Sequence, residues 1–171
     1  AAEPALAPSP GPMLTGKVLG VIDGGLAVAN ATFRRAQGNG PTRVMHFWRQ
    51  DNYYGGPWPG QATHGHREVP LDPARAGPIP DDMGYGHELT GAAIDEAIAL
   101  FTHHGQLDEE ALYAYLQMWD LSRPVNHGTH VTSLAAGAGL PLNPQHDEAS
   151  QVNLVAVQLD WSNVLDTSGG A

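Results

Sequence analysis

The stretch KVLGVIDGG at residues 17–25 determines the fold that we expect. Its apolar run is short and ends at a carboxylate followed by two glycines, which is typical of a strand buried on both faces of a parallel sheet. A carboxylate at the C-terminal end of such a strand lies where α/β folds place their sites. The stretch therefore predicts an α/β protein in which Asp23 belongs to a site.

Further strands and helices are predicted on either side of this stretch. The apolar runs at residues 43–48 and 152–159 predict two more strands. A first helix is expected from its N-cap at Thr90 to a stop at Gly105, with an apolar face made by Ile94, Ala97, Ile98 and Phe101. A second helix is expected from Asp108, with acidic residues in its first turn and an apolar face made by Leu112, Leu116 and Trp119.

The composition fits one folded domain and excludes several classes of protein. The chain has 171 residues, 42% of them hydrophobic, and a formal net charge of −10. Nucleic-acid binding has no electrostatic basis, and no apolar run reaches the roughly 18 residues that span a bilayer. The absence of cysteine excludes disulfides, thiolate metal sites and a cysteine nucleophile. Abundant Gly and Pro predict an extended tail at residues 1–12 and a long surface excursion at residues 51–88.

A second informative stretch, NHGTHV at residues 126–131, puts an imidazole at the start of a predicted helix. This helix is expected to run from about His127 to Gly137 through Val131, Leu134 and Ala135, with small residues that let it approach the sheet. A carboxylate beside imidazole Nδ1 fixes the tautomer and leaves Nε2 free to take a proton from a nucleophile. Asp23 and His127 would therefore supply two of the three groups of a catalytic triad.

With these two motifs the sequence resembles the subtilisin-like serine proteases, the subtilases. In that family the catalytic Asp follows an apolar strand, and the catalytic His is the first residue of His-Gly-Thr-His-Val, which stands here at residues 127–131. The resemblance implies that Asp23 is the orienting carboxylate and that His127 is the general base and acid. It also implies that Gly128 and Thr129 shape the start of the helix and that His130 is a hydrogen-bonded structural histidine.

The resemblance also implies a fold. It is a subtilisin-like three-layer α/β sandwich with a parallel sheet, of which residues 13–171 would form only the N-terminal half. The strand at residues 152–159 resembles the next core strand of the family. Asp23 and His127 are 104 positions apart, more than in compact subtilases, so an insertion with two helices is expected at about residues 51–122. The run GYGHELT at residues 84–90 resembles an inserted element of some bacterial subtilases.

The other half of the catalytic machinery is missing from this sequence. The nucleophile motif Gly-Thr-Ser-Met-Ala is absent, and so are the oxyanion-hole Asn and the strand that lines the substrate groove. Ser168 follows Thr and precedes Gly, but it stands in a Gly-rich turn rather than at the start of an apolar helix. We therefore do not expect Ser168 to be the nucleophile.

The function that the resemblance implies is that of a processed bacterial serine endopeptidase. This chain would supply Asp23 and His127, would be inactive alone, and would have as its partner the Ser-bearing C-terminal portion of the same precursor, which completes the sheet beyond the strand at residues 152–159. The substrate would be a peptide or protein. The alternative is a catalytically inactive subtilase-like module that binds peptides or a partner protein. A tail such as residues 1–12 can follow a removed export signal, so we expect a secreted or periplasmic protein, with a cytoplasmic location still open.

Two other groups of residues are candidates for binding a metal ion or a ligand. Zinc needs three or four converging ligands with firm spacing, which the histidines at 64, 66, 103 and 104 do not provide, so solvated loop histidines are expected and no cofactor is predicted. No acidic loop matches a calcium-ligand pattern well. The aromatic residues Trp48, Tyr53, Tyr54 and Trp58 are expected to pack a loop onto the sheet, with peptide or sugar binding as the alternative.

Overall fold

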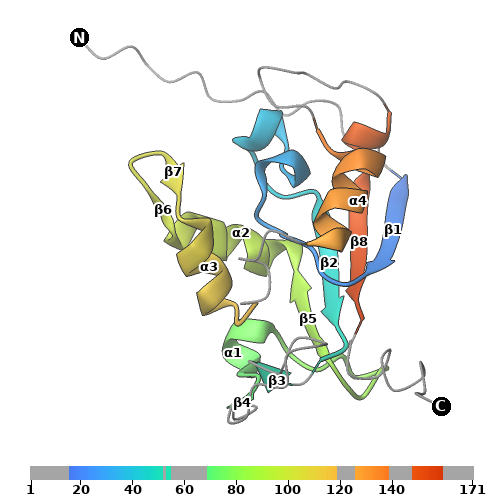
Figure 1. Ribbon diagram of the computed structural model, residues 1–171, viewed down its shortest axis with the longest axis vertical. Helices are drawn as coiled ribbons and strands as arrows, with labels where there is room; N and C mark the ends of the chain where they lie inside the picture. The colour runs from blue at the N-terminus through green and yellow to red at the C-terminus, as the bar shows by residue number, and fades with distance from the viewer. Residues whose placement is uncertain (1–15, 52, 55–68, 119–125, 139–147, 160–171) are drawn as a thin grey trace, which may run out of the picture.

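The computed structural model describes residues 16–51, 53–54, 69–118, 126–138 and 148–159 (Figure 1). Several features singled out above lie outside the described residues: the tail at 1–12, Trp58, His64, His66, Trp119 and Ser168.

A four-stranded sheet forms the centre of the described chain (Figure 1). Its strand order is β1 (Val18–Asp23), β8 (Asn153–Gln158), β2 (Val44–Arg49) and β5 (His87–Thr90). The first three strands are parallel, and β5 is antiparallel to β2. The three predicted strands are confirmed with small shifts in their bounds, and the chain is a mixed α/β protein with a mostly parallel sheet.

The register of the strands shows which face of the sheet carries the core. Residues that pair across parallel or antiparallel strands point to the same face. Two such rows lie on one face: Leu19, Leu154 and Val44, and then Val21, Ala156, Phe47 and Leu89. All but the two β1 residues are buried. The core therefore lies on one side of the sheet.

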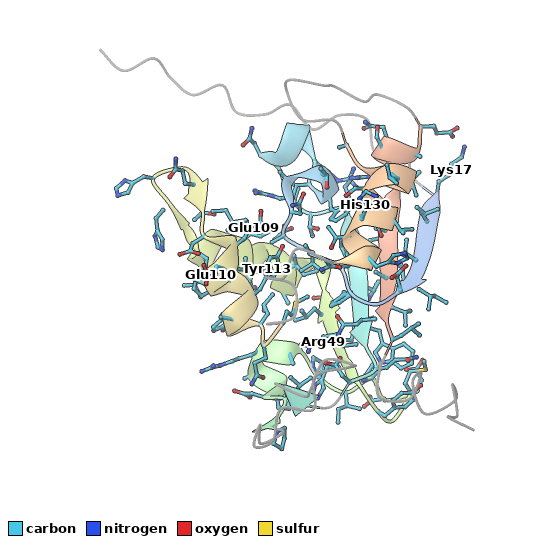
Figure 2. The ribbon with its side chains drawn as sticks, viewed as in Figure 1. Lys17, Arg49, Glu109, Glu110, Tyr113 and His130 are labelled. Atoms are coloured by element: carbon cyan, nitrogen blue, oxygen red, sulfur yellow. The ribbon has the colours of Figure 1, made fainter. Side chains whose placement is uncertain are left out.

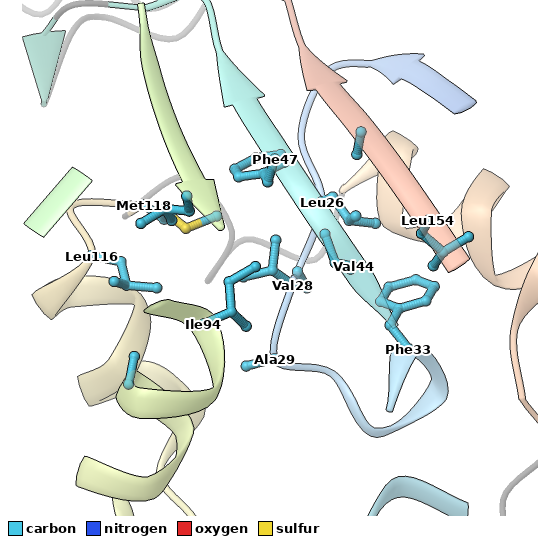
Figure 3. Close-up of a cluster of buried hydrophobic side chains, with 14 of the residues drawn as sticks. Leu26, Val28, Ala29, Phe33, Val44, Phe47, Ile94, Leu116, Met118 and Leu154 are labelled. Carbon is cyan, nitrogen blue, oxygen red and sulfur yellow. The ribbon is translucent and has the colours of Figure 1, made fainter. Parts of the chain in front are cut away.

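Three helices pack on this same side: α2 (Gly91–Leu100), α3 (Glu109–Tyr115) and α4 (His127–Ala136). Ile94 of α2 and Leu116 at the end of α3 join Phe47 and Leu154 of the sheet in one buried cluster (Figure 3). The helices of the expected insertion are thus part of the main core. Shorter elements complete the described chain: α1 (Pro73–Ala76), β3 (Tyr53–Tyr54) with β4 (Val69–Pro70), and the 3-10 helices Ala31–Phe33, Ala36–Gly38 and Ala149–Gln151.

The opposite face of the sheet is open. Val18 is 54% exposed, Ile22 68% and Met45 41%, and no described helix covers them. The expectation that the first strand is buried on both faces is therefore wrong for the described chain, because no described element packs on this face of β1. The described residues form two layers, a sheet and helices, and not the three layers of the expected sandwich.

The free edge of the sheet also differs from the expectation. The strand at the end of the chain was expected to need a neighbour, yet β8 lies inside the sheet between β1 and β2. On β1, the carbonyls of Lys17 and Asp23 accept bonds from β8, so the alternate residues Val18, Gly20 and Ile22 direct their backbone groups to the other side. That edge has no partner strand among the described residues.

One helix prediction needs correction. Thr90 caps α2 as expected, but the helix ends at Leu100 and Gly105 lies in a hairpin between β6 (Thr102–His103) and β7 (Gln106–Leu107). His104 and Gly105 have φ of 52° and 78°, the left-handed pair that a tight hairpin turn requires. The chain reverses there, so Gly105 does not stop the helix.

The apolar residues of α4 do not face the sheet. The helix spans the predicted residues, but Leu134 is 72% exposed and Val131 is also exposed. The buried side of α4 is made by the small residues Gly128, Thr132 and Ala136. Small side chains allow the backbone of α4 to lie close to the sheet, and this contact turns the larger apolar residues outward.

The segment expected to be a surface excursion, residues 51–88, contributes to the fold. Its last two residues belong to β5, where His87 is only 4% exposed. Leu71 and Ala76 are also buried. The sequence showed no periodicity there because the described elements of this segment, such as α1 and β3, are only two to four residues long.

Candidate active site

Asp23 is the last residue of β1 and stands at the carboxyl end of the parallel strands. Its side chain is 16% exposed, and Gly24 N donates a hydrogen bond of 2.6 Å to its Oδ1. Asp23 is therefore a fixed, mostly buried acceptor at the edge of the sheet.

His127 is the first residue of α4, where the chain comes back to the end of β1. Asn126 caps the helix through a bond of 3.2 Å from Thr129 N to its side-chain oxygen, which fixes the start of the helix at His127. The His127 ring is 69% exposed. A helix of a different length or start would turn this ring away from β1.

The two side chains meet. His127 Nδ1 lies 2.8 Å from Oδ1 and 2.9 Å from Oδ2 of Asp23. This contact agrees with the hydrogen-bond distance expected from the sequence, although the residues are 104 positions apart. The catalytic roles assigned to the two residues stay predictions.

Glycine makes this contact possible. A Cβ placed on Gly128 would lie 2.0 Å from Gly25 O and 3.1 Å from Asp23 Cβ. The backbone of α4 therefore touches the chain just after β1, at a distance that admits no side chain. On the far side of Gly128, Thr129 Oγ1 accepts a hydrogen bond of 2.8 Å from Ala27 N.

The pair has the chemistry of an orienting carboxylate and a base. A carboxylate on Nδ1 selects the tautomer with the proton on Nδ1 and leaves the Nε2 lone pair free. It also stabilises the imidazolium that forms when Nε2 takes a proton. Because the ring is exposed, Nε2 is open to a group supplied from outside the described residues.

His130 is placed differently from His127. Figure 2 shows it on α4, and its ring is exposed. None of the hydrogen bonds among the described residues involves this ring. The expected role of a hydrogen-bonded structural histidine therefore finds no support in the described part of the chain.

A second polar group lies at the carboxyl ends of the parallel strands, as Asp23 does, and was not predicted from the sequence. Arg49 and Gln158 end β2 and β8 in register with Asp23 and point to the same face. Asp51 accepts two bonds from Arg49, at 3.2 and 2.7 Å, and one of 3.3 Å from Gln158. Arg49 is 2% exposed and also donates to Leu116 O (Figure 2). An arginine at the end of an apolar run was the available signal, and its role is to join the sheet to α3.

Arg43 is the other buried cation. It is 1% exposed and its guanidinium donates to carbonyls of three segments, with acceptors Thr32 O, Ala136 O, Ala149 O and Val152 O. These bonds hold the C-terminal end of α4 against the start of β8. No sequence pattern distinguished Arg43 from a surface arginine.

Shifted pKa values occur away from the Asp23–His127 pair. Burial raises the pKa of the Tyr113 phenol, and the charge of Glu109 and its 3.0 Å hydrogen bond raise it further (Figure 2). Burial lowers the pKa of Arg34, against the opposing effect of the nearby carboxylates Asp95 and Glu109. Tyr113 therefore stays protonated, and this cluster connects α3 to the segment after β1 rather than forming a second reactive site.

The candidate metal-binding histidines and ligand-binding aromatic residues do not converge in the described chain. His103 and His104 are exposed in the hairpin after α2, and the described residues hold no group of three or more histidines or carboxylates that could bind a metal ion. Trp48 packs edge-on against Tyr85, with ring centroids 5.2 Å apart, and donates to Tyr85 O. This contact fits the expected packing role, while nothing is described for the side chains of Tyr53 and Tyr54.

The chain matches no family model, and no curated protein matches its sequence. In the part of the chain that the structure describes, no helix has the length and apolar character needed to cross a membrane. A function for this chain is therefore inferred from the geometry of the site.

Proposed function

We propose that this chain is the Asp and His half of the catalytic domain of a subtilisin-like serine endopeptidase. The observation that carries the proposal is the contact between His127 Nδ1 and both carboxylate oxygens of Asp23. In the assembled enzyme a serine attacks the peptide carbonyl. His127 Nε2 takes the serine proton and then gives it to the leaving amine. Asp23 stays ionised and holds the imidazolium in place.

The order of the elements supports this assignment. A carboxylate follows a parallel strand, an imidazole begins a helix, and the helix returns to the end of that strand. A subtilisin-like three-layer sandwich is part of the proposal, and the described sheet and helices would be two of its layers.

The serine comes, in this proposal, from a C-terminal portion of the same precursor. Three surfaces of the described chain could contact such a portion. They are the open sheet face, the free edge of β1, and the exposed apolar side of α4 with Val131 and Leu134. A contact that covers all three resembles a domain core cut in half, which buries more than about 2,000 Å². The proposed substrate is a peptide or protein, and the proposed location is secreted or periplasmic.

The chain alone is then inactive. It holds the base and the orienting carboxylate, but neither the nucleophile nor the oxyanion donors. Loss of a single oxyanion donor costs about 10² to 10³ in kcat, and loss of the serine removes the covalent step. Ser168 is not assigned as the nucleophile.

A fluorophosphonate probe, which labels activated serines, tests the proposal on material purified under native conditions. We expect the label on a second polypeptide that mass spectrometry under denaturing conditions separates from this chain. Asp23→Asn should lower the labelling rate by about 10⁴, because the wrong tautomer is then favoured. His130→Ala, an exposed histidine on the same helix, is the matched control and should leave labelling unchanged.

Two outcomes would contradict the proposal. Label at Ser168 would place the nucleophile in this chain. Absence of any labelled serine, together with saturable binding of unmodified peptides, would favour the inactive binding module instead.

A further inference from the structure

One hydrogen bond connects the first turn of α4 to the segment that follows β1. Ala27 N donates to Thr129 Oγ1 over 2.8 Å. Thr129 comes two residues after His127, and Ala27 comes four residues after Asp23. The bond thus lies directly behind the contact between His127 and Asp23, and it uses the same two segments.

The position of Thr129 on the helix gives this bond control over rotation. Successive residues of an α-helix are 100° apart, so the Thr129 and His127 side chains leave α4 about 200° apart. A turn of the helix about its axis that moves the imidazole away from Asp23 also moves the hydroxyl away from Ala27 N. Hydrogen bonds weaken steeply when their angle is lost, so the bond opposes such a turn.

The neighbouring contacts do not supply this control. Gly128 sets how closely α4 approaches Gly25, but a glycine without a side chain allows the helix to turn or slide at that distance. Asn126 bonds within its own helix, to Thr129 N, and so fixes where α4 begins rather than how it is oriented. A directional bond to the segment after β1 is what Thr129 adds.

We propose that Thr129 is a positioning residue, whose hydroxyl holds α4 in the rotation that keeps His127 Nδ1 on the Asp23 carboxylate. This inference rests on the proposed function for its catalytic meaning. Its structural content, that the hydroxyl determines which tautomer His127 adopts, stands on the two hydrogen bonds alone.

The test compares four substitutions. Thr129→Val keeps the shape of the side chain and removes the acceptor, whereas Thr129→Ser keeps the acceptor. The matched control is Thr132→Val, because Thr132 lies on the same helix, is fully buried, and its hydroxyl has no hydrogen-bond partner among the described residues. Thr129→Ala removes the same acceptor without a branched side chain and is the second variant.

Histidine-selective ¹⁵N NMR on the natively purified protein, with any polypeptide that accompanies it, reads the tautomer of the neutral His127 ring. The wild type, Thr129→Ser and Thr132→Val should show the proton on Nδ1. Thr129→Val and Thr129→Ala should lose that signal in favour of a proton on Nε2. Where peptidase activity is present, kcat should fall by about 10² while KM stays unchanged, as for a displacement of the base of about 1 Å.

Each result decides a separate point. Retention of the Nδ1 proton in folded Thr129→Val and Thr129→Ala would overturn the positioning role, and so would unfolding of both variants while Thr132→Val stays folded. A proton on Nε2 in the wild type would contradict the Asp23–His127 contact and the proposed function with it. Loss of the Nδ1 signal in the variants without any labelled serine would keep the role of Thr129 and reject the peptidase.

Discussion

At position 128 the chain has no room for a side chain, and this determines how closely His127 approaches Asp23. The nearest atoms to a Cβ there belong to the backbone of Gly25, which cannot move aside as the end of a flexible side chain can. A methyl group would push α4 away from β1 and lengthen the contact between His127 and Asp23.

Gly128→Ala should therefore lower the free energy of unfolding by about 1 to 3 kcal/mol, the usual cost of overpacking. Urea denaturation measures it. Gly20→Ala is the matched control, because a Cβ at Gly20 meets no atom within 4 Å, and it should change stability by no more than about 0.5 kcal/mol. Equal stability of the two variants would show that α4 does not lie against Gly25.

Tyr113 gives the stability of the protein a pH dependence on the alkaline side. The folded chain raises the pKa of this phenol through burial and Glu109, so it keeps a proton that the unfolded chain releases near pH 10. The unfolded state then binds fewer protons, and the free energy of unfolding falls as the pH rises above about 10.

Thermal denaturation at several values between about pH 8 and 11 tests this dependence. Tyr113→Phe should melt with a weaker decline in that range, although it also loses the hydrogen bond to Glu109. Tyr85→Phe, at a tyrosine that is 45% exposed, should decline as the wild type does. Parallel declines in the wild type and Tyr113→Phe would contradict the raised pKa.

The elements show what the sequence could predict and what it could not. The N-caps Thr90 and Asp108 and the start of α4 were predicted correctly, because a cap depends on residues within one helical turn. The contact of Asp23 with His127 was also expected, because it follows from two motifs. In both cases the deciding information is local or is carried by a motif.

The errors concern the surroundings of each element. The sequence predicted that α4 runs through Val131 and Leu134 but not which way they face, and the contact of Gly128 with Gly25 turns them outward. The apolar run of β8 does not show whether β8 lies at an edge of the sheet, because that depends on which strands pair with it. Buried Arg43 and Arg49 were missed because their carbonyl partners come from distant segments.

The exposed side of α4 gives a prediction at this scale. In the proposed complex, Leu134→Glu should prevent the Ser-bearing portion from copurifying, because it places a charge in the contact. It disturbs no buried side chain of this chain, since Leu134 is 72% exposed. Leu100→Glu is the matched control, since Leu100 is 57% exposed at the end of α2. Copurification that survives Leu134→Glu would show that α4 is not part of the contact.

The described part of the molecule is asymmetric about its sheet. One face carries α2, α3 and α4, while the other shows Val18 and Ile22 of the edge strand β1 and Met45 of β2. At the opposite edge of the sheet, Glu88 N bonds to Pro78 O, so β5 is partly covered. Soluble monomers cover or charge their long apolar edges, so β1 and the open face are the surface that the proposed partner would cover.

If the proposed partner covers this surface, the chain on its own should not be a stable monomer. With an apolar sheet face and an unpaired strand edge in water, it should self-associate, or melt without cooperativity, because exposed patches of this kind mark interaction sites or aggregation. Size-exclusion chromatography with light scattering, combined with calorimetry, measures both properties. The proposed complex should by contrast be monodisperse and melt cooperatively, because the second polypeptide would cover the face. A monodisperse 18.1 kDa monomer that melts cooperatively on its own would reject the divided catalytic domain and favour a self-contained binding module.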